Sequence, residues 1–170
     1  ELISEMTSSA SKLSKELGKL EGMTSNDKIA LNKTIGLGAL KYHILKVDPK
    51  KRILFDPNDS IDFNGNTGPF IQYTYARIQS LITKSNFKKT EFSNEVEIND
   101  KEKQLLKFIT LYPETIKTSA DNLNPALIAN YTYELVKNFN SYYQSNSILK
   151  VESKLVRTDR KSTRLNSSHQ

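Results

Sequence analysis

Apolar side chains recur every three or four residues through most of this sequence, and that spacing constrains its fold more than any other feature. It places the apolar residues along one side of an α-helix, whereas a half-buried strand would alternate them. The pattern covers about six segments, near residues 3–20, 26–45, 70–82, 99–111, 114–120 and 125–142. The sequence therefore predicts an all-α protein, a helical bundle with one irregular connection after the second helix, at residues 48–66.

Residues 64–84, NGNTGPFIQYTYARIQSLITK, are predicted to form a turn followed by a helix with two distinct faces. Asn64-Gly65 tolerates positive φ, and Pro69 suits a first helical turn, where a missing N–H has no partner to lose. One face carries an apolar series at spacings of four, three and four: Ile71, Tyr75, Ile78 and Ile82. We expect this series to pack in the core.

The second face of this helix carries Phe70, Tyr73 and Arg77. Two aromatic rings and a guanidinium on one face are typical of a surface on which unstacked RNA bases lie. The plainer alternative is that the two rings belong to the core and that Arg77 is a solvated cation. Taken alone, the helix favours this plainer alternative.

Gly36 and Gly38 fall inside the second predicted helix. A Gly-x-Gly pair can cradle phosphate, but only after a strand and with further glycine or Lys-Ser/Thr partners that are missing here. Close packing of two helices is therefore the better explanation of these glycines. His43, in the same helix, is expected to be a partly exposed helix residue.

Three aspartates, Asp56, Asp59 and Asp62, lie in the predicted connection. Carboxylates at these spacings could bind a metal or transfer protons, but no His or Glu joins them and the calcium-loop spacing is absent. We expect them to cap turns instead.

The chain of 170 residues contains no cysteine and two histidines, His43 and His169. The lack of cysteine excludes a disulfide framework and a Cys-based zinc site. The sequence also shows no phosphate-binding glycine loop and no convincing pair of carboxylates. We therefore expect no catalytic residue and no metal site in this chain, which has the character of a binding or scaffolding piece.

The net charge of +6 is a mild indication of a polyanionic partner, although the charges are spread along the sequence. No apolar run approaches the ~20 residues that span a bilayer, so no membrane partner is expected. The chain opens on a helical pattern without Met. We take this as a sign that preceding sequence is missing.

Residues 159–169, DRKSTRLNSSH, show no helical spacing and no apolar stripe. The string resembles the in-frame translation of a common DNA-sequencing adapter, so residues 159–170 are interpreted as a non-native, adapter-derived tail. The alternative is a natural disordered tail. Residues 159–170 hold three basic residues and one acidic residue, so without them the net charge falls from +6 to +4.

Four segments together resemble bacterial arginyl-tRNA synthetases, which are class I aminoacyl-tRNA synthetases. They are IGLGALKYHILKVDP at 35–49, SIDFNGNTGPFIQYTYARIQSL at 60–81, LYPETI at 111–116 and ANYTYELVKNFNSYYQ at 129–144. The resemblance covers essentially residues 1–158. It implies that residues 1–65 end the catalytic region and that residues 66–158 form a helical anticodon-binding domain, which is truncated.

The resemblance also implies a function for the whole protein, an arginine–tRNA ligase that uses ATP (with Mg). Its ATP and arginine sites would lie upstream, so that this fragment is inactive by itself and has tRNA as its partner. A cytoplasmic monomer is expected.

The family's GPYxQY aromatics, which hold the anticodon loop, fall on Phe70 and Tyr73, and the Tyr of its FNSxY motif falls on Tyr143. Many relatives have Tyr where this chain has Phe70, so a hydroxyl contact is lost there. Arg77 is assigned to phosphate or base contact because it shares a face with Tyr73. Asn140, on the same stripe of the last helix as Tyr143, completes the predicted tRNA-binding set.

Two alternatives to a ligase fragment remain open. A stand-alone helical RNA-binding module without catalysis would have no nucleotide-binding fold encoded upstream. A helical protein-interaction or structural piece would fail to bind RNA even at low salt, where phosphate contacts are strongest.

Overall fold

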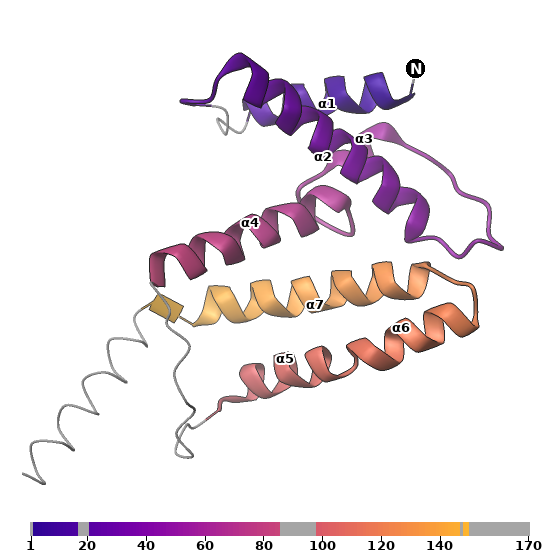
Figure 1. Ribbon diagram of the computed structural model, residues 1–170, viewed down its shortest axis with the longest axis vertical. Helices are drawn as coiled ribbons and strands as arrows, with labels where there is room; N and C mark the ends of the chain where they lie inside the picture. Colours follow the sequence, from indigo (N-terminus) through magenta and orange to yellow (C-terminus); the bar gives the residue numbers. More distant parts are fainter. Residues whose placement is uncertain (1, 17–20, 86–97, 147, 150–170) are drawn as a thin grey trace, which may run out of the picture.

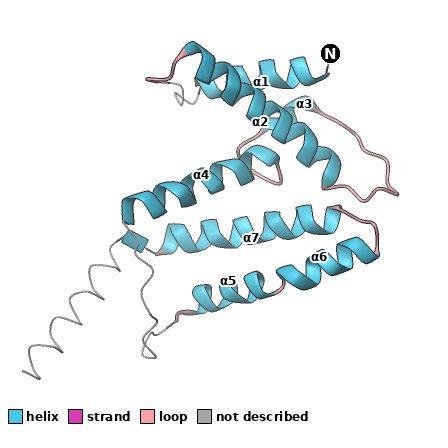
Figure 2. Cartoon of the chain, in the orientation of Figure 1, coloured by secondary structure: helices cyan, strands magenta, loops and turns pink. Residues whose placement is uncertain are grey.

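The structure is a computed structural model that describes residues 2–16, 21–85, 98–146 and 148–149, so the predicted tail at 159–170 lies outside the described residues. The described residues form seven α-helices and no β-strand (Figures 1 and 2), which confirms the predicted all-α fold. The helices are α1 (Leu2–Glu16), α2 (Ser25–Leu45), α3 (Pro57–Ile61), α4 (Gly68–Ser85), α5 (Asp100–Thr110), α6 (Tyr112–Asp121) and α7 (Ala126–Ser145). None of them is long and apolar enough to cross a membrane.

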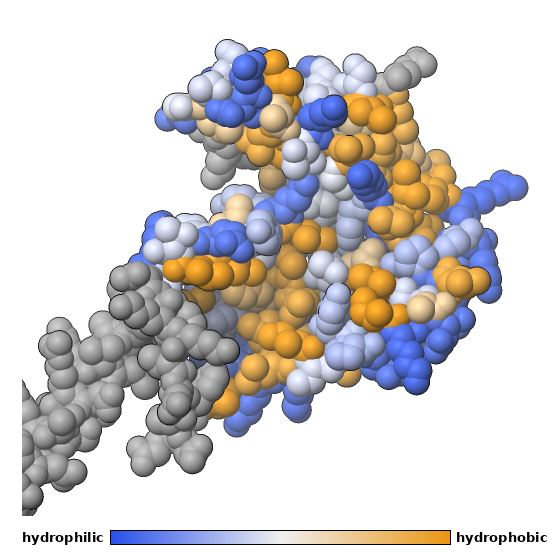
Figure 3. All heavy atoms as spheres, in the orientation of Figure 1, coloured by the Kyte–Doolittle hydropathy of each residue, from blue (hydrophilic) through white to orange (hydrophobic). Residues whose placement is uncertain are grey.

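The helices lie in successive layers (Figure 1). At one end α1, α2 and α3 pack together, and α4 lies against α2. Helix α7 lies beside α4, and α5 and α6 follow each other along the opposite side of α7. On the face drawn in Figure 3, apolar surface gathers in the middle of the molecule, between these layers.

The apolar core belongs to the α1–α3 end of the molecule. Its buried members are Met6, Ala10, Ile35, Ala39, Leu40 and Ile61. Helices α1 and α2 approach closely at Gly36, where a Cβ atom would lie 2.7 Å from the backbone oxygen of Met6. Helices α2 and α4 meet in the same way, because a Cβ on Gly68 would lie 2.6 Å from the backbone oxygen of Gly38. The prediction that Gly36 and Gly38 serve close helix packing is confirmed.

Side chains satisfy the free N–H groups at several helix starts. Asp56 caps α3, because its carboxylate accepts from the backbone N–H of Asn58 at 2.8 Å. Asp62 accepts from the N–H of Asn64 at 2.8 Å, so the prediction that these carboxylates cap turns is confirmed at both positions. Helix α5 begins with a capping box between Asn99 and Glu102.

Helix α4 is rotated relative to the prediction. Two members of the expected core series are exposed, Tyr75 at 64% and Ile82 at 53%, whereas Thr74 is completely buried. The prediction of a core stripe through Tyr75 and Ile82 is therefore wrong. Thr74 can be buried because its hydroxyl donates to the Phe70 carbonyl at 3.0 Å, which leaves no unpaired hydroxyl proton in the interior.

His43 is buried, so the prediction of a partly exposed helix residue is wrong. Its Nε2 lies 3.1 Å from the carbonyl oxygen of Leu54, which can only accept, so Nε2 is the donor there. Its Nδ1 lies 2.9 Å from the Ser60 hydroxyl, and the edge of its ring meets Phe55. His43 thus fastens the connection between α2 and α4 to the end of α2.

Candidate nucleic-acid interface

Helix α7 lies between two layers and uses a different face for each. Val136 and Asn140 are buried, and Asn140 is bonded to α4. On the other side Tyr131 donates to the Phe108 carbonyl at 2.7 Å, and Tyr142 donates to a carboxylate oxygen of Glu102 at 2.9 Å. With both sides fixed, the last turns of α7 carry Asn140 and Tyr143 to the end of α4.

Arg77 of α4 lies over two tyrosine rings. Its guanidinium carbon is 4.9 Å from the ring centre of Tyr73, on the same helix, and 4.8 Å from that of Tyr143, on α7. Such contacts contribute about 0.5–2 kcal/mol each, depending on how far they are desolvated. One guanidinium therefore covers a face of each ring and joins the two helices.

A chain of hydrogen bonds holds Arg77 from beneath. The buried Thr74 hydroxyl donates its only proton to the Phe70 carbonyl, so it can only accept from Asn140. The Asn140 amide Nδ2 donates to that hydroxyl at 2.8 Å. This leaves Asn140 Oδ1 as the acceptor for the Arg77 guanidinium, which donates to it.

Two phenylalanines extend the stack of rings. Phe63 meets Tyr73 edge-to-face at a centroid distance of 6.2 Å, and Phe139 stacks on Tyr143 at 6.3 Å. We call the set Phe63, Tyr73, Arg77, Tyr143 and Phe139 the aromatic–arginine ladder. It draws on α4, α7 and the connection before α4.

Four of the five residues predicted to bind tRNA meet here, namely Tyr73, Arg77, Asn140 and Tyr143. Phe70 lies apart from the ladder, since its ring packs against Tyr133 of α7 at 5.9 Å, and it contributes its carbonyl rather than an open ring. Tyr73 is 39% exposed, whereas Asn140 is only 8% exposed and has both amide atoms engaged.

Sequence reasoning missed Thr74 and Phe63. A hydroxyl residue four positions after Phe70, on the helix face that points to α7, was the available signal for Thr74. The apolar pattern did not include Thr74 because threonine is a residue type that is mostly exposed in proteins. Phe63 lies in the connection, where helical spacing carries no information.

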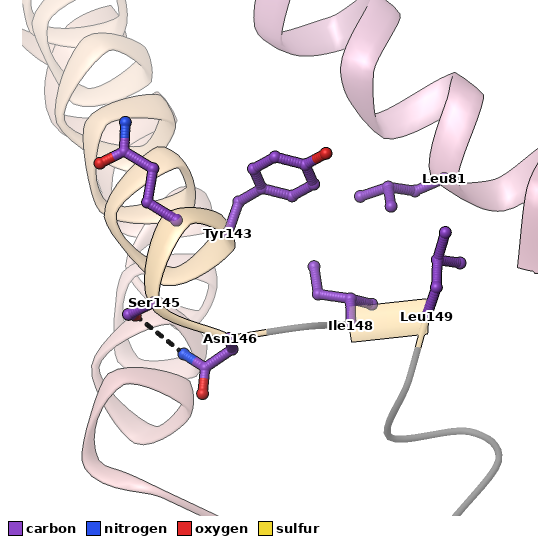
Figure 4. A pocket seen from close by; sticks show the side chains of 7 residues that line it. Leu81, Tyr143, Ser145, Asn146, Ile148 and Leu149 are labelled. Atoms are coloured by element: carbon purple, nitrogen blue, oxygen red, sulfur yellow. Dashed lines mark hydrogen bonds between the residues drawn. The ribbon is translucent and has the colours of Figure 1, made fainter.

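The ladder borders two adjoining hollows in the surface. One, of about 310 Å³, is lined by Tyr73, Ala76, Arg77, Ser80, Leu81, Lys84, Tyr143 and Leu149. The other, of about 380 Å³, is drawn in Figure 4, where the Tyr143 ring points towards Leu81 and faces Ile148 and Leu149. The first hollow, which we call the Arg77 pocket, therefore combines two cationic side chains with tyrosine rings.

Partly buried polar contacts fix the connection that precedes α4. Lys46 donates to the Asn66 carbonyl at 2.8 Å, and burial lowers the pKa of this ammonium while the charge of Asp59 opposes the shift. The Tyr42 hydroxyl lies 2.5 Å from Asn66 Oδ1 and 3.1 Å from the Ala129 carbonyl oxygen. Burial, and to a smaller extent Tyr133, raises the pKa of Tyr42 above its ordinary value. These contacts tie the start of α4 to α2 and to α7.

No group of three His, Cys, Asp or Glu side chains that could hold a metal ion exists within the described ranges. The site offers polar and aromatic groups instead. It presents aromatic rings, a guanidinium whose N–H donors suit phosphate or base edges, and a nearby lysine.

The family profile described as DALR anticodon binding domain matches residues 71–166, which include most of α4 and all of α5, α6 and α7. The chain belongs to this family. Tyr73, Arg77, Asn140 and Tyr143 all lie within the matched residues.

Proteins with similar sequences are named arginine–tRNA ligases. The protein from Flavobacterium psychrophilum is 60% identical over 149 residues, which is 88% of this chain and 25% of the relative. The protein from Bacteroides thetaiotaomicron is 44% identical over 164 residues, 94% of this chain and 28% of the relative. This chain thus spans about a quarter of the length of these relatives.

Solved structures give the same result for the fold. The arginyl-tRNA synthetase of Thermus thermophilus matches 86% of this chain with a TM-score of 0.76 and 26% identity, over 24% of its own length. That of Plasmodium falciparum matches 91% of this chain with a TM-score of 0.75 and 26% identity, over 28% of its length. The resemblance predicted from the sequence motifs is confirmed.

Proposed function

We propose that this chain is the anticodon-binding part of an arginine–tRNA ligase and that the aromatic–arginine ladder contacts the anticodon loop of tRNA. The proposal rests on one observation: the residues that match the anticodon-binding family include Arg77 and the two tyrosines that it covers. We assign residues 66–158 to this domain and residues 1–65 to the end of the catalytic region.

The proposed whole protein activates arginine with ATP, in the presence of Mg, and then transfers the arginyl group to the terminal ribose of tRNA. The described residues hold no metal-binding cluster, and the proposal places the ATP and arginine sites in sequence upstream of this chain. This chain would contribute grip on tRNA rather than a reacting group. We expect the protein to act as a monomer in the cytoplasm.

The position of Arg77 leaves the tyrosines a different role in tRNA binding from the base stacking that the sequence suggests. Arg77 covers one face of Tyr73 and one face of Tyr143, so a base cannot stack on those faces while the guanidinium is in place. Phe70, whose ring packs against Tyr133, is not an open platform either. We therefore assign recognition to the N–H edge of Arg77, with the tyrosines setting its position.

Alanine substitutions in the full-length enzyme test the proposal. Tyr73→Ala and Tyr143→Ala should each weaken tRNA binding roughly tenfold, because each removes one of the two rings that hold the Arg77 guanidinium, a contact of about 0.5–2 kcal/mol. Binding of arginine and ATP without tRNA should stay largely unchanged, because the proposal places those sites elsewhere.

The matched control is Tyr75→Ala, since Tyr75 lies on the same helix but is exposed and outside the Arg77 pocket. This variant should bind tRNA like the parent enzyme. Undiminished tRNA affinity in both ladder variants would refute the proposed role of the ladder.

A further inference from the structure

We propose that Thr74 and Asn140 are positioning residues for RNA recognition, which hold the Arg77 guanidinium over the rings of Tyr73 and Tyr143 with its remaining N–H groups at the Arg77 pocket. The inference rests on the proposed function. It assigns Asn140 a role beneath Arg77 instead of direct contact with RNA, and it adds Thr74, which no motif indicated.

The burial of the two side chains supports this role. Thr74 is completely buried and Asn140 nearly so, and neither lines the Arg77 pocket. Their hydrogen bonds run in one direction, from Arg77 to Asn140, from Asn140 to Thr74, and from Thr74 to the Phe70 carbonyl. A reversal of any bond would leave a buried donor or acceptor unpaired, so the arrangement specifies a single orientation of Asn140 Oδ1.

The bond from a threonine to its own helix does not explain the position of Thr74. Thr83, farther along α4, donates to the Gln79 carbonyl at 2.9 Å in the same i to i−4 manner, and it is exposed. Thr74 differs because it also accepts from Asn140, on another helix, and Asn140 in turn accepts from Arg77. The hydroxyl is therefore placed to orient the guanidinium through one intermediate side chain.

Within the described part of the chain, Arg77 keeps N–H donors for a ligand. A guanidinium has five N–H donors in a planar fork, and Asn140 accepts at only one of its nitrogens. The Arg77 pocket also contains Lys84, so the site suits a pair of acceptor atoms, either phosphate oxygens or the edge of a guanine. A guanidinium that is already oriented loses less side-chain freedom when it binds such a pair.

The first test compares two substitutions of Thr74. Thr74→Val keeps the shape but removes the hydroxyl, and Thr74→Ser keeps the hydroxyl. The probe is a short RNA hairpin that carries an arginine anticodon loop, and binding to the chain is followed by fluorescence anisotropy. Thr74→Val should weaken binding about tenfold, the effect of one lost buried hydrogen bond, while Thr74→Ser should restore most of the affinity. Thr83→Val, the matched control, should bind like the parent chain.

The second test asks whether Thr74 acts through Arg77. In a double-mutant cycle, Thr74→Val should weaken binding in the parent chain but add little further loss to Arg77→Ala. Equal losses in both backgrounds would mean that Thr74 serves only general stability, and the positioning role would be overturned. The positioning role would also be overturned if Arg77→Ala bound the hairpin normally and the two substitutions showed no coupling energy.

The source of the acceptor atoms can be read from the same titrations. If Arg77 contacts phosphate, Arg77→Ala should reduce the salt dependence of binding and weaken all hairpins alike. If it contacts a base edge, the variant should lose discrimination between the arginine loop and a loop with one altered base. Either result supports the inference, provided that Thr74→Val reproduces it in weaker form.

A measurement without RNA separates the inference from the proposed function. In NMR spectra the Arg77 N–H signals should be shifted by the two covering rings, and Thr74→Val should return them towards ordinary values while Thr74→Ser does not. Unchanged signals in Thr74→Val would overturn the positioning role alone. A parent chain that binds no hairpin even at low salt, yet shows the shifted signals, would instead overturn the proposed function and with it any role of this positioning in recognition.

Discussion

The two ends of the molecule are held together by different chemistry. Among helices α1, α2 and α3 the completely buried side chains include Met6, Ala10 and Ala39, and the core cluster is apolar, with His43 and Ser60 adding a polar contact between α2 and α3. Between α4 and α7 the buried side chains include Thr74 and Asn140, and the contacts are hydrogen bonds and a cation over aromatic rings. Both regions consist of packed helices, yet only the second fixes the direction of a charged group.

The difference follows from the physics of the two kinds of contact. Apolar burial is non-directional and contributes according to the area removed from water, so it stabilises a block without orienting any particular atom. A hydrogen bond contributes only about 1 kcal/mol of net stability, but a buried donor or acceptor without a partner is strongly unfavourable. The hydrogen-bonded contact of Thr74, Asn140 and Arg77 between α4 and α7, which we call the polar seam, is thus well suited to holding Arg77 in place. The apolar core is suited to holding the helices that support it.

The largest effect on stability should come from the apolar core. Met6→Ala removes a completely buried side chain and should lower the free energy of unfolding by about 3 kcal/mol, within the usual range for such cavities. Ile3→Ala, on the same helix but half exposed, is the control and should have a clearly smaller effect. Chemical denaturation measures both. Equal effects would mean that the core assignment of α1 is incorrect.

The close approach of α1 and α2 gives the next largest effect. Gly36→Ala would push its Cβ against the backbone of Met6 and should destabilise the chain by about 2 kcal/mol. In Gly38→Ala the atoms nearest to the new Cβ all belong to the flexible side chain of Gln72, and the better helix propensity of Ala offsets its displacement. Thermal melting of the pair should separate them; a Gly38→Ala variant as unstable as Gly36→Ala would contradict the difference.

The polar seam should respond differently to removal in part and in whole. Thr74→Val alone leaves the Asn140 amide without its acceptor and should lower the free energy of unfolding by about 1–2 kcal/mol. The double variant Thr74→Val/Asn140→Leu also removes the acceptor of Arg77, which lines the Arg77 pocket and can be hydrated there, so it should recover part of that loss. Denaturant titrations of the three proteins decide the matter, and a double variant that is less stable than Thr74→Val would show that the seam supplies stability as well as orientation.

The smallest expected effect lies on the far side of α7 and depends on pH. Burial first, and then the hydrogen bond to Glu102 and its charge, raise the pKa of Tyr142 to about 12. An unfolded tyrosine titrates near pH 10, so above that pH the unfolded chain binds fewer protons and the free energy of unfolding falls as pH rises.

Tyr142→Phe should therefore reduce the slope of stability against pH between about 10 and 12, because one proton no longer differs between the two states. Glu102→Gln, which keeps the phenol but removes the charge, should give an intermediate slope. Urea titrations at a series of pH values measure this. Identical slopes in the parent chain and in Tyr142→Phe would contradict the raised pKa.

Helical spacing was enough to predict the class of fold and most helix positions. The expected ranges 26–45 and 125–142 closely match α2 and α7, and the two glycines were correctly assigned to helix packing because they fitted no phosphate loop. Helical spacing failed for the face of α4, where it placed Tyr75 in the core. The rule scores apolar residues only, and the buried residue was a threonine whose hydroxyl is satisfied within its own helix.

The residues of the site could be predicted only in part, because motifs identify positions but not contacts. Tyr73 and Tyr143 were indicated by their motifs, and the structure brings their rings together beneath Arg77. Their covered faces could not be foreseen, since that depends on how α4 and α7 pack. Asn140 was expected to touch RNA because of its stripe, but its burial depends on a neighbour 66 residues away, Thr74.

Glu102 has two separate partners for its two carboxylate oxygens. One oxygen accepts from the backbone N–H of Asn99 and completes the capping box of α5, and the other accepts from Tyr142 of α7. Helix α5 buries no side chain of its own, and Lys101 adds hydrogen bonds to Ser141 and Ser145 of α7, so polar contacts to α7 secure its start. Its first turn and its attachment to α7 should consequently form in one cooperative event, and amide exchange there should report the arrival of α7 rather than local fraying.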